Sequence, residues 1–258
     1  MGIVNVTPDS FSDGGKYYSH TKAVEHSLKL LNDGADIIDI GGESTRPGAE
    51  KVSENEEIDR VLSVIQTLKN EKQEVTISID STKSKVVEES LKMGANIIND
   101  ISGGQFDNNM FNVASKYNVP IVIMHIKGEP KNMQQNPHYN NVISEISSYF
   151  EKRIENAREN NVNKIILDPG IGFGKRVEDN YEILNRLKDF NKFNYPILVG
   201  VSKKSFLGKS LNLEVSEREN ASVISETIAC CNGAKIIRTH NVKNAVEIKK
   251  IFSNLNRN

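Results

Sequence analysis

Eight short runs of apolar residues, rich in isoleucine and valine, recur along the chain, and polar segments separate them. The runs lie at residues 2–6, 37–42, 76–80, 97–102, 120–125, 165–170, 197–202 and 236–240. Each has the length of a strand and is nearly continuous in hydrophobicity, which is typical of parallel strands buried on both faces. The pattern therefore predicts eight parallel β-strands.

Helical periodicity fills the segments between the runs. After the second run, apolar residues follow the i, i+3, i+4, i+7 spacing of an amphipathic helix: Ile58, Val61, Leu62, Ile65 and Leu68. Eight such β and α elements in 258 residues predict an α/β fold, a (β/α)8 TIM barrel. An open doubly wound sheet is the alternative, although it usually has fewer strands. No linker or low-complexity stretch divides the chain, so residues 1–258 are expected to form a single domain.

The predicted helices also carry signals at their ends. Ser53 with Glu56, and Ser216 with Glu219, have the spacing of a capping box at a helix start. A Gly-Ala pair precedes three strands, in "DGADIID", "MGANIIND" and "NGAKIIR", and glycine commonly ends a helix. This repeated pair indicates a repeated helix-to-strand unit.

Charge and composition exclude several classes of protein. The formal net charge is −1, so no global basic field points to a nucleic acid or an anionic membrane as a partner. No apolar run approaches the ~20 residues that span a bilayer. Met1 leads directly into a strand and not into a signal peptide, so a cytoplasmic protein is expected. Cys230 and Cys231 are adjacent, which disfavours a structural disulfide, and we expect both to be reduced and in or near the core.

Polar residues collect where the predicted strands end. In chain order these ends carry Asn5, the segment 41–43, Asp80, Asn99, Asp100, His125, Asp168, Lys203, Lys204, Arg238 and His240. Each of them alone could be a helix cap or a turn residue. In a (β/α)8 barrel, however, the carboxyl ends of all strands meet at one rim, where the active site lies. The sequence therefore predicts a site at that rim.

The residue types at this rim limit its chemistry. Acceptor oxygens come from Asp80, Asn99 and Asp168. They match the donor-rich edge of a heterocycle such as an aminopyrimidinone. Positive or donor groups come from Lys204, Arg238 and His240. They suit a carbonyl or a phosphate, so a small ligand that is part flat heterocycle and part anion fits both sets.

Two other kinds of site fit less well. A metal site of histidines and carboxylates is disfavoured because no HxH or HxxxH spacing is present. The segment 168–175, "DPGIGFGK", lacks the final Ser or Thr of a Walker loop and the GxGxxG spacing of a dinucleotide fold. We expect it to form a tight strand-to-helix turn that lets a ligand approach the backbone.

Six blocks of the chain carry a family resemblance. They are "GIVNVTPDSFSDGG", "GGESTRPGAE", "IINDISGG", "LDPGIGFGK", "SKKSFLG" and "IIRTH", and they extend from the first predicted strand to the last. In content and order they resemble the bacterial dihydropteroate synthase family. The resemblance implies a TIM-barrel transferase of folate biosynthesis and a sulfonamide target. It would join 6-hydroxymethyl-7,8-dihydropterin diphosphate to p-aminobenzoate and release pyrophosphate, with Mg²⁺ present.

The resemblance also implies roles for individual residues. The pterin would be hydrogen-bonded by Asp80, Asn99, Asp168 and Lys204, with Arg238 beside its ring. The diphosphate would be held by Asn5, Arg238 and His240, and the metal ion by Asn5 and Asp13. The p-aminobenzoate would be lined by Phe11, Thr45, Arg46 and Ser205, and the implied substrate-binding set also includes Phe173 and Thr239. The implied catalytic residues are Asp80, Asp168, Lys204, Arg238 and His240.

The family typically forms homodimers, so the resemblance also implies an interface. The helices near the end of the chain offer apolar residues for that interface or for packing on the barrel: Val223, Ile224, Ile228, Val246 and Ile248.

One departure from the family pattern and two rival functions stay open. Lys203 stands where an arginine is commoner, next to Lys204. A tetrahydrofolate-binding methyltransferase domain would share the pterin contacts but would not need Phe11, Asp13, Arg46 and the Lys-Ser pair at 204–205. A non-catalytic pterin-binding barrel is the second rival, and it predicts the loss of a phosphate or metal residue.

Overall fold

Strands form in the structure where the apolar runs predict them. The computed structural model describes residues 1–7, 15–44, 48, 49 and 51–255, with the backbone alone for 15–19. The strands are β1 (Gly2–Asn5), β2 (Ile38–Gly41), β3 (Ile77–Asp80), β4 (Ile97–Asp100), β5 (Ile121–Met124), β6 (Ile165–Asp168), β7 (Leu198–Val199) and β8 (Ile236–Ile237). All eight predicted strands are confirmed.

The strands join side by side into a closed barrel. β1 to β6 form one parallel sheet in chain order, and β7 pairs with β8 in parallel. Isolated parallel bridges, Leu167 to Ile197 and Gly2 to Thr239, connect these two groups. At the second bridge Thr239 N donates to Met1 O at 3.0 Å. The sheet therefore returns to its first strand, so the (β/α)8 prediction is confirmed and the open doubly wound alternative is wrong.

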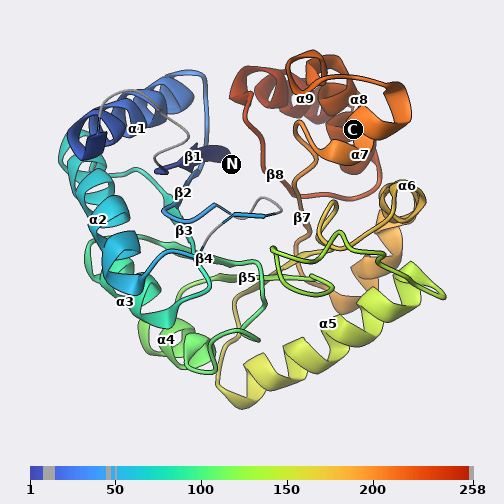
Figure 1. Cartoon of the computed structure of the whole chain (residues 1–258), viewed down its shortest axis with the longest axis horizontal. Helices are drawn as coiled ribbons and strands as arrows, with labels where there is room; N and C mark the ends of the chain where they lie inside the picture. Colours follow the sequence, from blue (N-terminus) through green and yellow to red (C-terminus); the bar gives the residue numbers. More distant parts are fainter. Residues whose placement is uncertain (8–14, 45–47, 50, 256–258) are drawn as a thin grey trace.

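Helices surround the barrel and cover its outer face (Figure 1). In chain order they are α1 (Gly15–Asn32), α2 (Glu54–Glu71), α3 (Ser84–Lys92), α4 (Met110–Tyr117), α5 (Val142–Glu159), α6 (Val177–Asn185), α7 (Ser205–Leu211), α8 (Glu219–Cys231) and α9 (Val242–Leu255). Two 3₁₀ helices, η2 (Leu187–Phe193) and η3 (Val215–Glu217), lie in the connections after α6 and α7.

The two predicted capping boxes have different outcomes. Ser53 caps α2, because its Oγ accepts a hydrogen bond from Glu56 N at 3.3 Å. The second prediction is wrong, because Ser216 lies inside η3. There Glu217 Oε2 instead accepts a hydrogen bond from Glu214 N at 2.8 Å, which tightens the chain into a 3₁₀ turn before α8.

The Gly-Ala pairs end α1, α3 and α8 with one geometry. Their glycines have φ angles of +99°, +106° and +103°, in the left-handed region that glycine adopts without strain. The N–H of each following alanine reaches back five residues, to Leu30 O, Ser90 O and Ala229 O. These are Schellman-type helix ends, so the repeated helix-to-strand unit is confirmed.

α8 ends in the two cysteines, of which Cys230 is half-buried and Cys231 is exposed. The buried face of α8 passes through Ala221, Ser225 and Ala229, and Cys231 lies off that stripe. The core location expected for Cys231 is therefore wrong.

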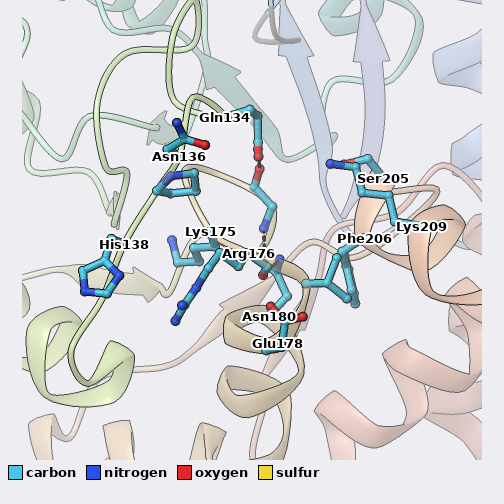
Figure 2. Close-up of a pocket in the computed structure, with 13 residues that line it drawn as sticks. Gln134, Asn136, His138, Lys175, Arg176, Glu178, Asn180, Ser205, Phe206 and Lys209 are labelled. Carbon is cyan, nitrogen blue, oxygen red and sulfur yellow. Dashed lines mark hydrogen bonds between the residues drawn. The ribbon is translucent and has the colours of Figure 1, made fainter.

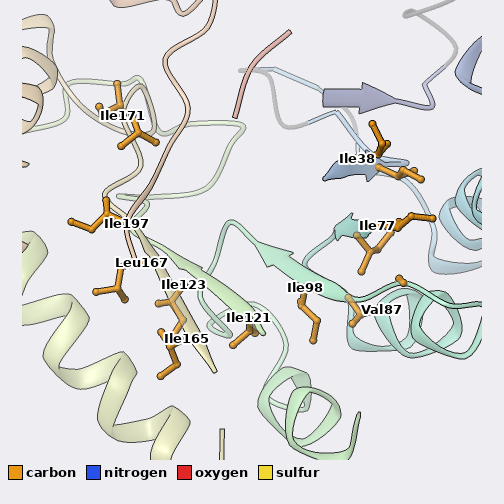
Figure 3. Packing of buried hydrophobic residues seen from close by; sticks show 14 of the residues in the cluster. Ile38, Ile77, Val87, Ile98, Ile121, Ile123, Ile165, Leu167, Ile171 and Ile197 are labelled. Carbon is orange, nitrogen blue, oxygen red and sulfur yellow. The ribbon is translucent and has the colours of Figure 1, made fainter. Parts of the chain in front are cut away.

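Alternation along the strands separates an outer apolar cluster from an inner one. Side chains of one parity, among them Ile38, Ile77, Ile98 and Ile121, pack outward against the helices (Figure 3). Side chains of the other parity point into the barrel and form an inner cluster: Met1, Ile97, Val122, Ile166 and Leu198, with Ile37 and Ile236 packed against it. The barrel interior is thus a packed core and not a pore.

We expect Phe150→Ala to destabilise the protein by about 3–5 kcal/mol, because it would leave a cavity in a fully packed region. Phe150 of α5 is fully buried and makes edge-to-face contacts with Phe190 and Phe193 of η2, at ring-centroid distances of 5.6 and 5.8 Å. The free energy of unfolding in urea measures the loss. Phe106, which is 45% exposed, is the control, and Phe106→Ala should cost less than about 1 kcal/mol. Equal losses for the two variants would contradict this account of the core.

Candidate active site

The inward-facing positions of the barrel change from apolar to polar toward the carboxyl ends of the strands. The inner apolar cluster includes Ile37, Ile97, Ile166 and Ile236. Two residues further along, the same chain segments present Asp39, Asn99, Asp168 and Arg238. Because side chains alternate with a period of two, these four polar groups also point inward. The rim that the sequence predicts as a site is therefore built on the polar end of the barrel interior.

Arg238 connects three strands in this interior. Its Nε donates to Asp39 Oδ2 at 2.7 Å, and its Nη2 donates to Asp80 Oδ2 at 2.6 Å. Asn99 Nδ2 donates to the same Asp39 Oδ2 at 3.0 Å. Asp39 is not among the predicted site residues. A single acid inside the apolar run 37–42 is nevertheless a signal, because a buried carboxylate needs partners.

Burial and charge compete in this network. Burial raises the pKa of Asp80 to about 7, although Arg238 beside it acts in the opposite direction. Burial also works against the charge of Arg238, but the Asp39 and Asp80 carboxylates outweigh it and raise the Arg238 pKa. The guanidinium therefore stays charged, while Asp80 titrates close to neutral pH.

A second group of site residues lies around Lys204, in the loop after β7. Lys204 Nζ donates to Ile171 O and lies 4.4 Å from the centroid of the Phe173 ring. Burial lowers the pKa of Lys204 to about 8, and the nearby Asp168 opposes this change. Asp168 Oδ1 accepts a hydrogen bond from Gly170 N at 2.7 Å, and burial raises the pKa of Asp168. A ligand here would meet an ammonium, a carboxylate and an aromatic ring together.

The glycine-rich segment 168–175 forms the tight strand-to-helix turn that was predicted, and it wraps around a buried lysine. Lys175 Nζ donates to Gly170 O at 2.7 Å and to Phe173 O at 3.0 Å, and it lies 3.0 Å from His125 Nδ1. A Cβ atom at Gly170 would sit 1.9 Å from His125 O, so only glycine fits there. Lys175 is not among the predicted site residues, and its only signal in the sequence is its place at the end of the glycine-rich run.

Two polar strand-end residues do not reach the barrel interior. Asp100 has the outward parity, and its carboxylate accepts hydrogen bonds from Ser102 N at 2.8 Å and Gly104 N at 2.6 Å. His125 also has the outward parity and packs edge-on against Tyr149, with ring centroids 5.0 Å apart. The expectation that both lie at the rim is wrong, since each is shifted by one residue from the inward positions.

The remaining predicted residues of the last two strand ends occupy three different environments. His240 has the inward parity, and its Nδ1 lies 3.0 Å from Ser202 Oγ. Thr239 is buried, and its Oγ1 accepts a hydrogen bond from Asn241 N at 3.2 Å. Lys203 turns away toward α8, where its Nζ lies 3.8 Å from Glu219 Oε2. Four predicted site residues lie outside the described residues: Phe11, Asp13, Thr45 and Arg46.

Similarity to known proteins decides the family. A family model described as pterin binding enzyme matches residues 1–240. The dihydropteroate synthase of Escherichia coli (strain K12) is 46% identical over 253 residues, which cover 97% of this chain and 89% of that protein. The chain belongs to the dihydropteroate synthase family. The resemblance found in the six sequence blocks is confirmed, and the protein is an enzyme, a transferase of folate synthesis.

Solved dihydropteroate synthase structures have the same fold as this chain. The enzyme from Clostridium difficile, solved in the presence of pteroic acid, has a TM-score of 0.93 and 40% identity, with 100% of this chain and 96% of that chain covered. The enzyme from Xanthomonas albilineans, solved with 4-aminobenzoic acid, has a TM-score of 0.93 and 36% identity, with 100% and 93% covered. In the described part of this chain, no helix is both long and apolar enough to cross a membrane.

Membership of the dihydropteroate synthase family raises the question of a metal ion. Within the described residues, no three His, Cys, Asp or Glu side chains are grouped so that they could hold one. Of the two predicted ligands, Asn5 ends β1 with the inward parity and is half-buried, and Asp13 lies outside the described residues. A carboxamide and a carboxylate are the hard oxygen donors that Mg²⁺ prefers, so these residue types fit the ion.

A groove of about 490 Å³ lies beside the barrel mouth, and Figure 2 shows the residues that line it. Its walls include Gln134 from the β5–α5 loop, Arg176 before α6, and Ser205 at the start of α7. Gly172 also lines the groove, and a Cβ atom there would lie 2.8 Å from the Lys204 side chain. None of the carboxylates inside the barrel lines the groove. The polar chemistry is therefore in the barrel mouth, and the groove is a neighbouring space that reaches Ser205.

Proposed function

We propose that this chain joins 6-hydroxymethyl-7,8-dihydropterin diphosphate to p-aminobenzoate and forms 7,8-dihydropteroate and pyrophosphate. One observation carries this proposal: the barrel mouth holds carboxylate acceptors, a charged guanidinium and an ammonium within one inward-facing set. Such a set matches a flat heterocycle that carries an anionic leaving group. Membership of the dihydropteroate synthase family and the relatives solved with pteroic acid and 4-aminobenzoic acid support it.

The pterin would lie among the inward-facing residues. The side-chain oxygens of Asp80, Asn99 and Asp168 would accept hydrogen bonds from its N–H groups. Its carbonyl would face Lys204. Arg238 would lie beside the ring, which suits a planar guanidinium. Burial strengthens each of these interactions, because little water competes inside the barrel.

The diphosphate would lie at the mouth, near Asn5, Arg238 and His240. Asn5 and Asp13 would hold Mg²⁺, which when bound supplies positive charge to the departing pyrophosphate. Arg238 already carries a charge that its carboxylate partners maintain, so it can stabilise a second anion without losing its proton.

The p-aminobenzoate would lie on the outer side of the pterin. Phe11, Thr45, Arg46 and Ser205 would line it, with Phe173 and Thr239 as further substrate-binding residues. The groove that reaches Ser205 gives this side of the site an opening to solvent.

The reaction we propose is a dissociative substitution. The C–O bond between the pterin methylene and the diphosphate breaks first, and its electron pair leaves with pyrophosphate. The methylene carbon becomes cationic and is stabilised by conjugation with the electron-rich ring. The aniline nitrogen of p-aminobenzoate then attacks this carbon and loses its proton to solvent, so no strong base is needed.

The charges of the site favour this path. The carboxylates of Asp80 and Asp168 lie in a buried interior of low dielectric. There a nearby negative charge stabilises a developing carbocation more strongly than it would in water. Asp80 and Asp168 would carry most of this effect, because they lie nearest the open end of the barrel.

A cytoplasmic homodimer is the proposed assembly, with its interface on α8 and α9. These two helices pack together and expose Ile224 and Ile228 of α8, and Ile251 and Leu255 of α9. Apolar side chains gathered on an exposed face are a common feature of subunit interfaces. Ile248, in contrast, is buried in the protein itself, so it would serve packing and not the interface.

The activity is tested by pyrophosphate release from the dihydropterin diphosphate with Mg²⁺, with and without p-aminobenzoate. We expect release that accelerates with p-aminobenzoate and yields dihydropteroate. Slow release without p-aminobenzoate would support the dissociative path, and its complete absence with the pterin bound would contradict that path. If the pterin binds and no product forms under either condition, the chain is a non-catalytic pterin-binding barrel.

The pH dependence of kcat/KM tests the proposed charge states. Asp80 loses its charge below about pH 7 and Lys204 loses its charge above about pH 8, so activity should be highest between these values and fall on both sides. The charges of Arg238, Asp39, Glu57 and Asp100 also act on the pKa of Asp80, but burial has the largest effect. In Lys204→Arg the alkaline limb should move to higher pH, because a guanidinium does not titrate there, while the acid limb stays in place. An alkaline limb that does not move would exclude Lys204 as its source.

The dimer is tested with Ile228→Glu. A carboxylate at this exposed apolar position should weaken self-association at least about tenfold, because burying an unpaired charge in an interface is costly. Sedimentation velocity over a range of concentrations measures the change. Thr227→Glu, at the exposed neighbouring position, is the control for the added charge. A wild-type protein that is monomeric at all concentrations would refute the proposed assembly.

A further inference from the structure

Asp39 is a buried acid that the proposed reaction does not use directly. It lies in the middle of β2, is fully buried and points into the barrel. Its Oδ2 accepts hydrogen bonds from Arg238 Nε and Asn99 Nδ2, at 2.7 and 3.0 Å. We propose that Asp39 is a positioning residue that orients Arg238 and Asn99 for the pterin ring. This inference rests on the proposed function.

The first consequence concerns the amide of Asn99. An ionised carboxylate only accepts hydrogen bonds, so Asp39 fixes the amide with its NH₂ group turned toward Oδ2. The carbonyl oxygen of Asn99 is then left to accept from a ligand N–H. Without the carboxylate, both amide orientations would be possible, and one of them presents a donor where the ligand needs an acceptor.

The second consequence concerns the plane of Arg238. Nε and Nη2 lie on one edge of the guanidinium, and two carboxylates from neighbouring strands hold that edge. Nε is the donor closest to the backbone, so the bond to Asp39 restricts the plane more than the bond to Asp80 does. If a pterin draws Asp80 toward itself, Asp39 still keeps the guanidinium in place beside the ring.

A purely structural role explains Asp39 less well. The β2 residues on either side, Ile38 and Ile40, are fully buried and apolar, and an apolar residue at position 39 would continue the inner apolar cluster. Its other oxygen, Oδ1, has no hydrogen-bond partner within the described residues, which is a cost to folding. The hydrogen-bond partners of the carboxylate are two residues of the proposed pterin site, so its benefit is orientation at that site.

The experiment compares Asp39→Asn with the control Asp36→Asn. Asp36 precedes the same strand at the opposite end of the barrel and pairs on the surface with Lys249, at 2.8 Å. In Asp39→Asn we expect the Kd for 6-hydroxymethylpterin, measured by calorimetry, to rise at least about tenfold, as loss of a hydrogen bond to a charged group implies. The KM for p-aminobenzoate should change less than about twofold, since Asp39 faces the pterin residues only. Asp36→Asn should match the wild type in both.

The pH profile gives a second readout, which reports the Asp39 carboxylate next to Asp80. The Asp39 charge is one of the groups that raise the pKa of Asp80, so its removal should shift the acid limb of kcat/KM to lower pH. An unchanged pterin Kd with an unmoved acid limb would overturn the inference. So would an equal loss for both substrates together with a lowered melting temperature.

If Asp39→Asn does not fold, the wild type still tests the proposal. The Nε–H resonance of Arg238 should stay slow in hydrogen exchange when 6-hydroxymethylpterin is added, because Asp39 keeps its hydrogen bond. Fast exchange of this proton in the complex would overturn the inference. A wild type that neither binds nor converts the pterin would instead refute the proposed function, so the two failures are distinguishable.

Discussion

A guanidinium held between two buried carboxylates organises the mouth of this barrel. Arg238 follows β8, while Asp39 and Asp80 belong to β2 and β3, and Asn99 of β4 joins them through Asp39. Charges inside a protein must be paired, because water is not there to solvate them. The network therefore depends on closure of the barrel, since the bridge from Thr239 to Gly2 brings the chain that carries Arg238 beside the first strands.

The same constraint shapes the opposite wall of the site. The amine of Lys175 is buried, which lowers its pKa, and it donates hydrogen bonds to the carbonyls of Gly170 and Phe173. This gives the segment 168–175 one conformation, in which Phe173 lies against Lys204. Buried basic side chains on both sides thus hold the groups that would contact a pterin, Arg238 on one side and Lys175 on the other. The proposed chemistry and the packing of this barrel therefore depend on the same buried polar contacts.

The sequence predicted most of the fold and much of the site, for a local reason. Strand runs, helix periods and Gly-Ala helix ends are properties of neighbouring residues. The structure has strands, helices and helix ends at these places, although the last two strands are shorter than their runs. Polar residues at strand ends were also visible. The side of the strand on which each of them lies could not be predicted. Asp100 and His125 were therefore expected at the rim, although they face outward. A shift of one residue along a strand reverses the face on which a side chain lies.

By itself, the sequence determined the eight βα units, the polar rim and the dihydropteroate synthase family. Each of these is recognised from short segments of neighbouring residues. Only the tertiary structure decided which charges pair. Arg238 and Asp39 are 199 residues apart, and no local pattern connects them. Their contact exists because the barrel closes and gives both side chains the inward parity. The low dielectric of that interior then makes the pairing obligatory.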